Sequence, residues 1–231
     1  MNKNIEYKLG TGCNIAETAI IGKGCKIGDN VVIHHYVVIY DGTEIGDNTE
    51  IFDHAVIGRQ PKGAGNQISK INNNCEPVVI GENCVIGTSV VIYAGCKCGH
   101  NVMLSDMVAL REECTIGNNV VLGRFVDFNH HVTVGDNSKI MDCCHITSRT
   151  VIENDVFLGV GIMSANDNNM QIKGKPVTSE IRIKPGTKIG SGAILLPDVK
   201  IGENSVVGSG SVVTKSVKKE TTVMGIPAKE R

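Results

Sequence analysis

The sequence predicts an all-β fold, a parallel β-helix, and two observations support this class. Apolar residues recur at every sixth position in three registers that begin at Leu9, Ile80 and Ile183, and all 29 positions are apolar although only 41% of the chain is. A period of six fits neither an α-helix nor a simple alternating strand, and it is typical of hexapeptide β-helices. Aromatic residues make up only 3% of the chain and Trp is absent, so Ile, Val and Leu must fill the core.

The repeat resembles that of left-handed β-helices, in which three hexapeptides form one triangular coil. The 29 hexapeptides then predict about ten coils, stacked at about 4.8 Å. Residues 1–213 form the predicted β-helix, and residues 214–231 form a short C-terminal tail.

Two breaks in the repeat predict loops near residues 59–77 and 167–182. The first break, from Ile57 to Ile80, is interpreted as one coil plus five residues. The second break, from Leu158 to Ile183, is interpreted as two hexapeptides plus an insertion of about 13 residues. Long insertions in a regular repeat often carry function.

Composition excludes several classes of protein. The net charge of −1 and the pI near 6.6 predict no nucleic-acid partner. No apolar run approaches the roughly 20 residues of a membrane span, and the first residues lack an export signal, so we expect a cytoplasmic protein without membrane contact. Nine cysteines, an odd number without an export signal, argue against a disulfide framework, and the absence of a C-x-x-C pair argues against a structural zinc site. Six occupy the small interior corner position and are expected to be buried: Cys13, Cys25, Cys84, Cys96, Cys114 and Cys144.

One corner of the predicted triangle differs because its column after the apolar ladder contains no glycine. That column reads Tyr93, Arg111, Asn129 and Thr147, and the next reads Ala94, Glu112, His130, Ser148 and Asn166. Residues one coil apart lie one strand spacing apart, so Glu112 should neighbour His130 and hold it as a general base. His131 and Glu113 repeat this pairing one position later and remain an alternative pair. A solvated polar edge is the other interpretation.

The ladder, the two loops and the ending GSGSVVTKSVKKETTVMGIPAKER together resemble the hexapeptide acyltransferases, which are typically trimers with active sites between subunits. The stretch FNHHVTVGDNSKI resembles the nucleotide-sugar 4-amino N-acetyltransferases, whose proposed base matches His130, although their acidic neighbour is His131 here. The segments IGRQPKGAG, VALREECTIG and SANDNNM resemble single-domain amino-sugar acyltransferases. In some of those relatives the coenzyme A sulfur is thought to collect the proton.

The resemblance implies an acyl-CoA-dependent N-acyltransferase acting on a nucleotide-linked amino-deoxysugar, with dTDP-4-amino-4,6-dideoxyglucose as the favoured substrate. Acyl-coenzyme A is the implied co-substrate, and no metal is expected. The expected catalytic residues are His130, Glu112 and Asn166. The expected substrate-binding residues are Arg111, Tyr93, Arg59, Gln60 and Lys62. The expected coenzyme A contacts are Lys215, Pro227 and Lys229.

Three alternatives remain open at this point. An O-acetyltransferase of a sugar or another small molecule shares the repeat, but the galactoside and serine branches place a catalytic His near the position of Asn166. A γ-type carbonic anhydrase uses three His ligands, two of them separated by four residues, and no His-x-x-x-x-His pair occurs. A non-enzymatic β-helix scaffold would not need the ending that resembles a coenzyme A site.

Overall fold

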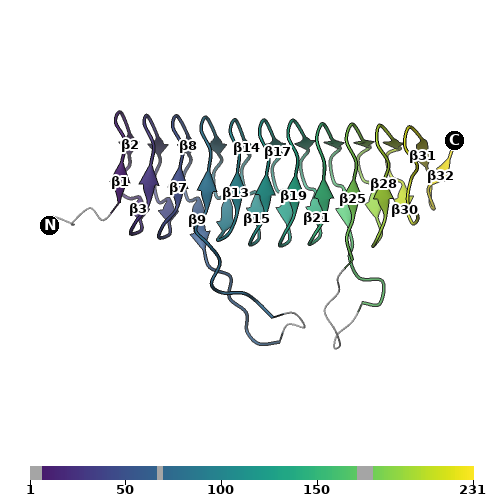
Figure 1. Ribbon diagram of the computed structural model, residues 1–231, viewed down its shortest axis with the longest axis horizontal. Helices are drawn as coiled ribbons and strands as arrows, with labels where there is room; N and C mark the ends of the chain where they lie inside the picture. Colours follow the sequence, from purple (N-terminus) through teal and green to yellow (C-terminus); the bar gives the residue numbers. More distant parts are fainter. Residues whose placement is uncertain (1–6, 67–69, 171–178) are drawn as a thin grey trace.

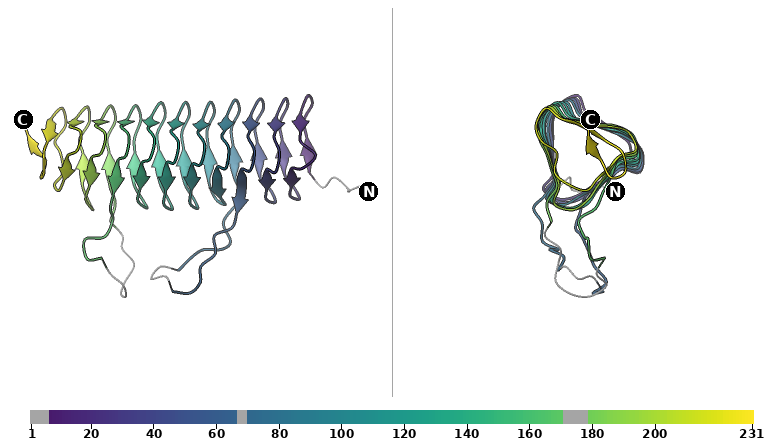
Figure 2. Two further views of the ribbon diagram at one scale, coloured as in Figure 1. Left: turned by 180° about the vertical axis from the view of Figure 1, so that it is seen from behind. Right: turned by 90° about the vertical axis from the view of Figure 1, so that its right-hand side faces the viewer.

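The structure, a computed structural model, describes residues 7–66, 70–170 and 179–231 as a three-sided prism of stacked coils (Figure 1). Three sheets, here called A, B and C, form its sides and contain 10, 12 and 10 strands. Viewed along its long axis, the prism is triangular (Figure 2). The all-β prediction is confirmed, and the architecture fits the left-handed β-helix that the repeat predicts.

The strands are short, and consecutive strands belong to consecutive sheets. Sheet A contains β1 (Lys8–Leu9), β4 (Lys26–Ile27), β7 (Glu44–Ile45), β10 (Val79–Ile80), β13 (Lys97–Cys98), β16 (Thr115–Ile116), β19 (Thr133–Val134), β22 (Val151–Ile152), β25 (Arg182–Ile183) and β28 (Lys200–Ile201). Sheet B contains β2 (Asn14–Ile15), β5 (Val32–Ile33), β8 (Glu50–Ile51), β11 (Val85–Ile86), β14 (Met103–Leu104), β17 (Val121–Leu122), β20 (Lys139–Ile140), β23 (Phe157–Leu158), β26 (Lys188–Ile189), β29 (Val206–Val207), β31 (Thr222–Met224) and β32 (Lys229–Glu230). Sheet C contains β3 (Ile20–Ile21), β6 (Val38–Ile39), β9 (Val56–Arg59), β12 (Val91–Tyr93), β15 (Ala109–Leu110), β18 (Asp127–Phe128), β21 (His145–Ile146), β24 (Met163–Ser164), β27 (Ile194–Leu195) and β30 (Val212–Val213).

The apolar ladder fills the interior because successive residues of a strand face opposite sides. In most strands the second residue points inward and is buried, and the first points outward. Parallel pairing places Leu110 beside Ile92 and Phe128 on its two neighbouring coils, and all three side chains are fully buried. The return to the same edge after three hexapeptides, which the sequence predicts, is thus confirmed across the middle of the chain.

The corner cysteines serve as small buried side chains, as the sequence predicts. Five of the six are buried and Cys13 is half-buried. The Cys84 thiol donates to the carbonyl oxygen of Gly99 at 3.2 Å, and the Cys144 thiol donates to that of Gly159 at 3.1 Å. Burial raises the pKa of Cys84 and Cys144, in the second case to about 11. All nine cysteines of the chain are free thiols.

The three corners of the prism share a backbone geometry but carry different side chains. At the A–B corner, where sheet A leads into sheet B, the left-handed position is mostly Asn, which accepts this conformation well. The Asn101 amide there donates to the Asn119 side chain on the next coil at 3.2 Å. At the B–C corner the same position holds Tyr36, Met107 and Phe125, which are all more than half exposed.

Both insertions leave the prism at the C–A corner and extend on the same side (Figures 1 and 2). The first joins β9 to β10, and Ile80 pairs with Ile45 of the preceding coil. The first break therefore contains one hexapeptide and a longer insertion, so its interpretation as a coil plus five residues was wrong. The residue count alone could not show this, because the inserted backbone leaves the prism and re-enters it at the same corner. The second insertion joins β24 to β25, and its length fits the interpretation made from the sequence; its residues 171–178 lie outside the described residues.

The C-terminal segment closes the last coil. Val217 bridges Ile201 of sheet A, and β31 pairs in parallel with β29 of sheet B. Strand β32 then runs antiparallel to β31. Across the described ranges 7–66, 70–170 and 179–231, the structure contains no helix long and apolar enough to cross a membrane.

Replacing Ile140 by Ala should lower the free energy of unfolding by about 2–5 kcal/mol, because its side chain is fully buried in the ladder. Its neighbour Lys139 is exposed on the same strand β20, and Lys139→Ala should change stability by less than about 0.5 kcal/mol. Urea unfolding followed by circular dichroism measures both. Equal losses would contradict the assignment of the inward and outward faces.

Candidate active site

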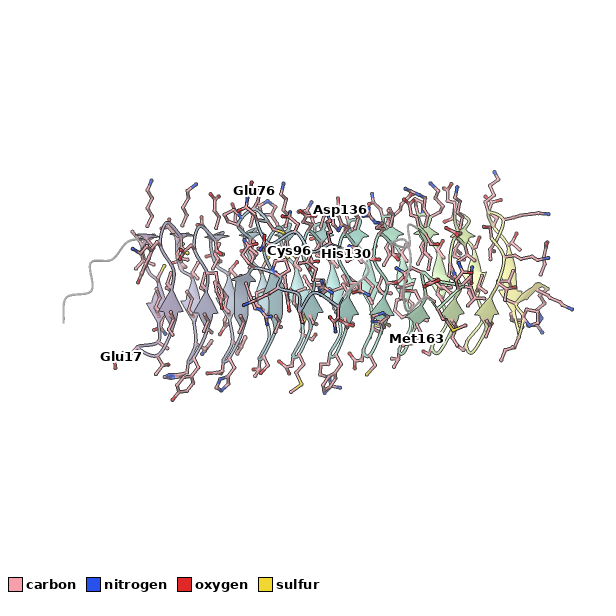
Figure 3. All side chains as sticks on the ribbon, turned by 90° about the horizontal axis from the view of Figure 1, so that it is seen from below. Glu17, Glu76, Cys96, His130, Asp136 and Met163 are labelled. Atoms are coloured by element: carbon pink, nitrogen blue, oxygen red, sulfur yellow. The ribbon has the colours of Figure 1, made fainter. Side chains whose placement is uncertain are left out.

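The candidate site occupies four consecutive turns of the C–A corner, between the two insertions. These turns are residues 93–95, 111–113, 129–131 and 147–149, and they follow β12, β15, β18 and β21. Figure 3 places His130 along the prism axis between Glu76 of the first insertion and Met163 just before the second. The corner column that the sequence analysis singled out therefore runs from one insertion to the other.

Glu112 lies one coil before His130, as its position in the repeat predicts. The His131 amide donates to the Glu112 carbonyl oxygen at 3.0 Å, which fixes this register. The Glu112 carboxylate, however, accepts two hydrogen bonds from the Arg111 guanidinium, at 2.8 and 2.9 Å. A guanidinium fork matches both carboxylate oxygens, so the Glu112 carboxylate binds Arg111 directly, and its orienting role toward His130 stays a prediction.

The ring of His130 instead contacts His131. Their Nδ1 atoms lie 2.9 Å apart, and the two rings meet edge to face with their centroids 5.0 Å apart. The other ring nitrogen of His131, Nε2, contacts a carboxylate oxygen of Glu113 on the preceding coil. Of the two histidine–carboxylate pairs that the sequence left open, the structure therefore brings His131 and Glu113 into direct contact.

The pKa of His130 lies below its ordinary value of 6.5. Burial is the largest cause, because it disfavours the charged imidazolium. A proton on His131 would act in the same direction, as do the guanidinium groups of Arg111 and Arg149, whereas the Glu112 carboxylate opposes them. His130 is therefore held in its neutral form, which has a lone pair available for a proton.

Ser148 and Asn166 continue the column toward the second insertion. The Asn166 amide donates to the Ser148 hydroxyl oxygen at 2.8 Å, and Ser148 is buried. Beneath them the Ser164 hydroxyl accepts from the Thr147 amide at 2.7 Å. The predicted order of Glu112, His130, Ser148 and Asn166 is thus the order along this edge.

A cationic and aromatic stack forms the other end of the site. Tyr93 lies between Arg59 on the preceding coil and Arg111 on the following one, and the two guanidinium carbons are 5.0 and 5.8 Å from the centre of its ring. Both distances fall in the range of cation–π attraction. The structure therefore brings together three of the five residues expected to bind substrate.

The other two expected substrate residues belong to the first insertion. The side-chain amide of Gln60 donates to the Cys75 carbonyl oxygen at 2.8 Å and accepts from the Cys75 amide at 2.9 Å. Gln60 thus closes the base of the insertion, and its expected role as a substrate ligand stays a prediction. Lys62 lies beyond this closure and is exposed.

The first insertion also reaches the histidine cluster, which the sequence analysis did not foresee. The Asn72 amide lies 3.5 Å from a Glu113 carboxylate oxygen, and the charge of Glu113 contributes to the raised pKa of the buried Cys75 thiol. Arg149 was missed as well. A step of one coil from His131 would have found it, whereas no repeat register extends into the insertion to reveal Asn72.

The expected coenzyme A residues lie at the C-terminal end of the prism. Lys215, Pro227 and Lys229 are all exposed. Lys215 follows β30, which is four coils beyond β18 in sheet C, a separation of roughly 19 Å along the axis at about 4.8 Å per coil. Only an extended molecule can contact both His130 and this end. Within the part of the chain that the structure describes, no three His, Cys, Asp or Glu side chains gather as a metal-binding group.

Two family profiles match the chain. The profile of the bacterial transferase hexapeptide (six repeats) matches residues 24–59, 113–148 and 180–215, and that of the hexapeptide repeat of succinyl-transferase matches residues 77–105. Together they cover more than half of the chain. The protein belongs to the hexapeptide-repeat transferases.

Named relatives of this hexapeptide-repeat transferase are acyltransferases, in agreement with the predicted enzyme class. It is 32% identical over 88 residues to the galactoside O-acetyltransferase of Lactococcus lactis, and this match covers 33% of this chain and 42% of the relative. It is 30% identical over 92 residues to the galactoside O-acetyltransferase of Escherichia coli, and this match covers 35% of this chain and 45% of the relative. The matches thus span less than half of the length of these curated relatives.

Solved structures with the same fold include the UDP-N-acetylglucosamine acyltransferase from Campylobacter jejuni. The similarity has a TM-score of 0.58 at 21% identity and covers 98% of this chain and 70% of that one. The UDP-N-acetylglucosamine acyltransferase of Arabidopsis gives a TM-score of 0.51 at 18% identity over 99% of this chain and 70% of that one. At these identities the similarity confirms the fold of the hexapeptide-repeat transferase.

Replacing Gln60 by Ala should loosen the base of the first insertion, because two hydrogen bonds to the Cys75 backbone are lost. Limited proteolysis measures this, and cleavage between residues 59 and 77 should become faster while the rest of the prism stays intact. Lys62→Ala, at an exposed position of the same insertion, is the control. Unchanged cleavage of the Gln60 variant would show that another contact closes the insertion.

Proposed function

We propose that the protein is an acyl-CoA-dependent N-acyltransferase that acylates the amino group of a nucleotide-linked amino-deoxysugar, with dTDP-4-amino-4,6-dideoxyglucose as the favoured substrate. The observation that carries the proposal is the neutral His130, held beside His131 at a corner lined by arginines. The coarser class, an acyltransferase of the hexapeptide family, is supported by the matched profiles and the named relatives.

The chemistry suits a weak base. The neutral amine attacks the thioester carbonyl carbon, the C–N bond forms, and the nitrogen becomes positively charged and strongly acidic. His130 takes that proton and passes it to the sulfur as the C–S bond breaks, which releases coenzyme A as its thiol. A neutral histidine can perform this step.

The cationic stack provides a site for the nucleotide diphosphate. Arg59 flanks Tyr93 at the base of the first insertion, and Lys62 extends from the same insertion. Arg59 and Lys62 supply positive charge for phosphate oxygens, and the Tyr93 ring offers an apolar edge to a sugar or base. Arg111 shares its charge with Glu112, so it contributes mainly by positioning Tyr93.

The remaining polar residues orient the reacting groups. The amide of Asn166 is directed to Ser148, and its carbonyl oxygen supplies an acceptor for the amine of the sugar. An acyl-coenzyme A molecule with its thioester near His130 would extend along the prism to Lys215, Pro227 and Lys229, where lysines meet its phosphates. The galactoside and serine O-acetyltransferases place a catalytic histidine near the position of Asn166, so this residue disfavours O-acetyl transfer of that kind.

We further infer that the site is completed by neighbouring copies in a homotrimer. The C–A corner is a convex edge, and a convex edge alone does not enclose a thioester or exclude water. At the B–C corner, Tyr36, Met107 and Phe125 expose more than half of their side chains in a left-handed backbone conformation that disfavours bulky residues. Contact of these three side chains with a second copy would bury them and give the site a second wall.

His130→Ala should lower turnover by about 10²–10⁴-fold, because the proton acceptor is lost. The measurement is thiol release from acyl-CoA donors against a panel of dTDP-, UDP- and GDP-linked amino sugars. In the native enzyme kcat should fall as the pH drops below 6.5 toward the lowered pKa of His130, since protonation removes the lone pair. His100→Ala, on the exposed A–B corner, is the matched control. A near-normal rate for His130→Ala would assign proton collection to the coenzyme A sulfur.

Phe125→Asp should give a smaller particle and little activity, because a charge among these three side chains opposes contact between copies. Sedimentation velocity measures the mass and the thiol assay measures the activity. Arg124→Asp changes the preceding exposed residue and is the control for charge alone. A fully active monomer on dilution would contradict the intersubunit site.

A further inference from the structure

We propose that Glu113 and His131 form a hydrogen-bonded chain that positions His130, fixing its proton on Nδ1 and leaving Nε2 as the atom that accepts the substrate proton. The inference rests on the proposed function for its chemical purpose, but the tautomer that it assigns is a property of the free protein. Glu113 and His131 are positioning residues in this proposal, and His130 is the catalytic residue.

The direction of each hydrogen bond follows from the chemistry of its partners. An ionised carboxylate only accepts hydrogen bonds, so the contact with Glu113 requires that the Nε2 atom of His131 carries a proton. A neutral imidazole has one N–H, so the Nδ1 atom of His131 is then an acceptor. The Nδ1 atom of His130, 2.9 Å away, must therefore donate. The Nε2 atom of His130 is left with its lone pair.

The opposite direction would disable the base. If His131 became doubly protonated, its Nδ1 would donate to His130, whose proton would then move to Nε2. The groups around His130 that influence this balance are His131, Glu112, Arg111 and Arg149. Glu113 lies on the far side of His131, and its carboxylate accepts the hydrogen bond from the Nε2 atom of His131. The carboxylate thereby influences which nitrogen of His130 carries the proton.

The backbone gives independent support for a function at these positions. Glu113 and His131 occupy the left-handed corner position with φ of 62° and 60°, a conformation that disfavours long side chains. At the A–B corner the same position is mostly Asn, for example Asn101 and Asn119. Long side chains at a position where a short one suits the backbone better indicate that their reach is used.

The first insertion holds Glu113, the outer end of this hydrogen-bonded chain. The Asn72 amide approaches the Glu113 oxygen Oε1, while His131 contacts Oε2. Cys75 covers this region from the same insertion and is buried. Both carboxylate oxygens thus have a partner, so the carboxylate cannot rotate freely away from His131. The base of the insertion, closed by Gln60, therefore supports the geometry of the proton acceptor.

The test is the protonation pattern of the histidine rings in the full-length protein, measured by long-range ¹H–¹⁵N NMR without substrate. His130→Gln identifies the signals of His130 by their loss. In the native protein at pH 7.5, His130 should show one tautomer, with Nδ1 protonated and Nε2 bare. A proton on Nε2 of His130 would overturn the proposal.

Two substitutions break the hydrogen-bonded chain at corner positions whose backbone suits Asn. In Glu113→Asn and His131→Asn the shorter side chain suits the left-handed backbone and removes the contact. Both should shift His130 toward the tautomer protonated on Nε2, which an isolated imidazole prefers. Glu50→Gln, at a carboxylate that contacts His34 at 2.8 Å away from the site, should leave His130 unchanged. An unchanged tautomer in His131→Asn would refute the chain.

Kinetics separate this proposal from the proposed function. Glu113→Asn and His131→Asn should lower kcat by on the order of 10-fold or more, less than His130→Ala, with little change in KM. In His131→Asn the acidic limb of the pH–rate profile should also move to higher pH, because a proton on His131 no longer opposes protonation of His130. If no acyl transfer is found at all, the NMR result still decides whether the hydrogen-bonded chain fixes the tautomer of His130. If His130→Ala is inactive but the tautomer is not as assigned, the function stands and the chain is refuted.

Discussion

The parallel ladder of backbone hydrogen bonds is the constraint on which the whole structure depends. Each coil donates to and accepts from its neighbours, so the chain must return to the same edge after three hexapeptides or lose a row of bonds. This return places the ladder side chains inside the prism and fixes which outward residues stack. Insertions are accommodated only at corners, where the chain can leave and re-enter without shifting the register. Function is therefore built by choosing side chains along an edge rather than by reshaping the backbone.

The three corners show how one backbone geometry takes on different roles. At the A–B corner, stacked Asn residues such as Asn101 and Asn119 satisfy one another's amides and serve the fold. At the C–A corner, the corresponding positions hold Glu113, His131 and Arg149, whose groups ionise. Only this corner carries both insertions. Acid–base chemistry is concentrated on the edge where inserted segments can add walls, because a regular prism has no concave surface of its own.

Periodicity predicted what depends on the backbone and failed where side chains compete. The ladder, the coil geometry and the order of Glu112, His130 and Asn166 follow from counting residues, since hydrogen bonding leaves one register. The partner of Glu112 does not follow from counting, because Arg111 is adjacent in sequence and offers a better-matched donor than the histidine one coil away. The contact of Gln60 does not follow from counting either, because Gln60 lies in an insertion, where no register shows that its amide closes the base.

The electrostatics of the corner reconcile two routes for the proton that the sequence left open. Burial, His131 and the neighbouring arginines all disfavour an imidazolium at His130, so a proton taken from the attacking amine is held only weakly. A thiol has a pKa of about 8.5 in water, well above that of this histidine. Transfer from His130 to the departing sulfur is therefore downhill. In this mechanism the histidine removes the proton during attack and the sulfur receives it during cleavage. The lowered pKa makes His130 a carrier between the two.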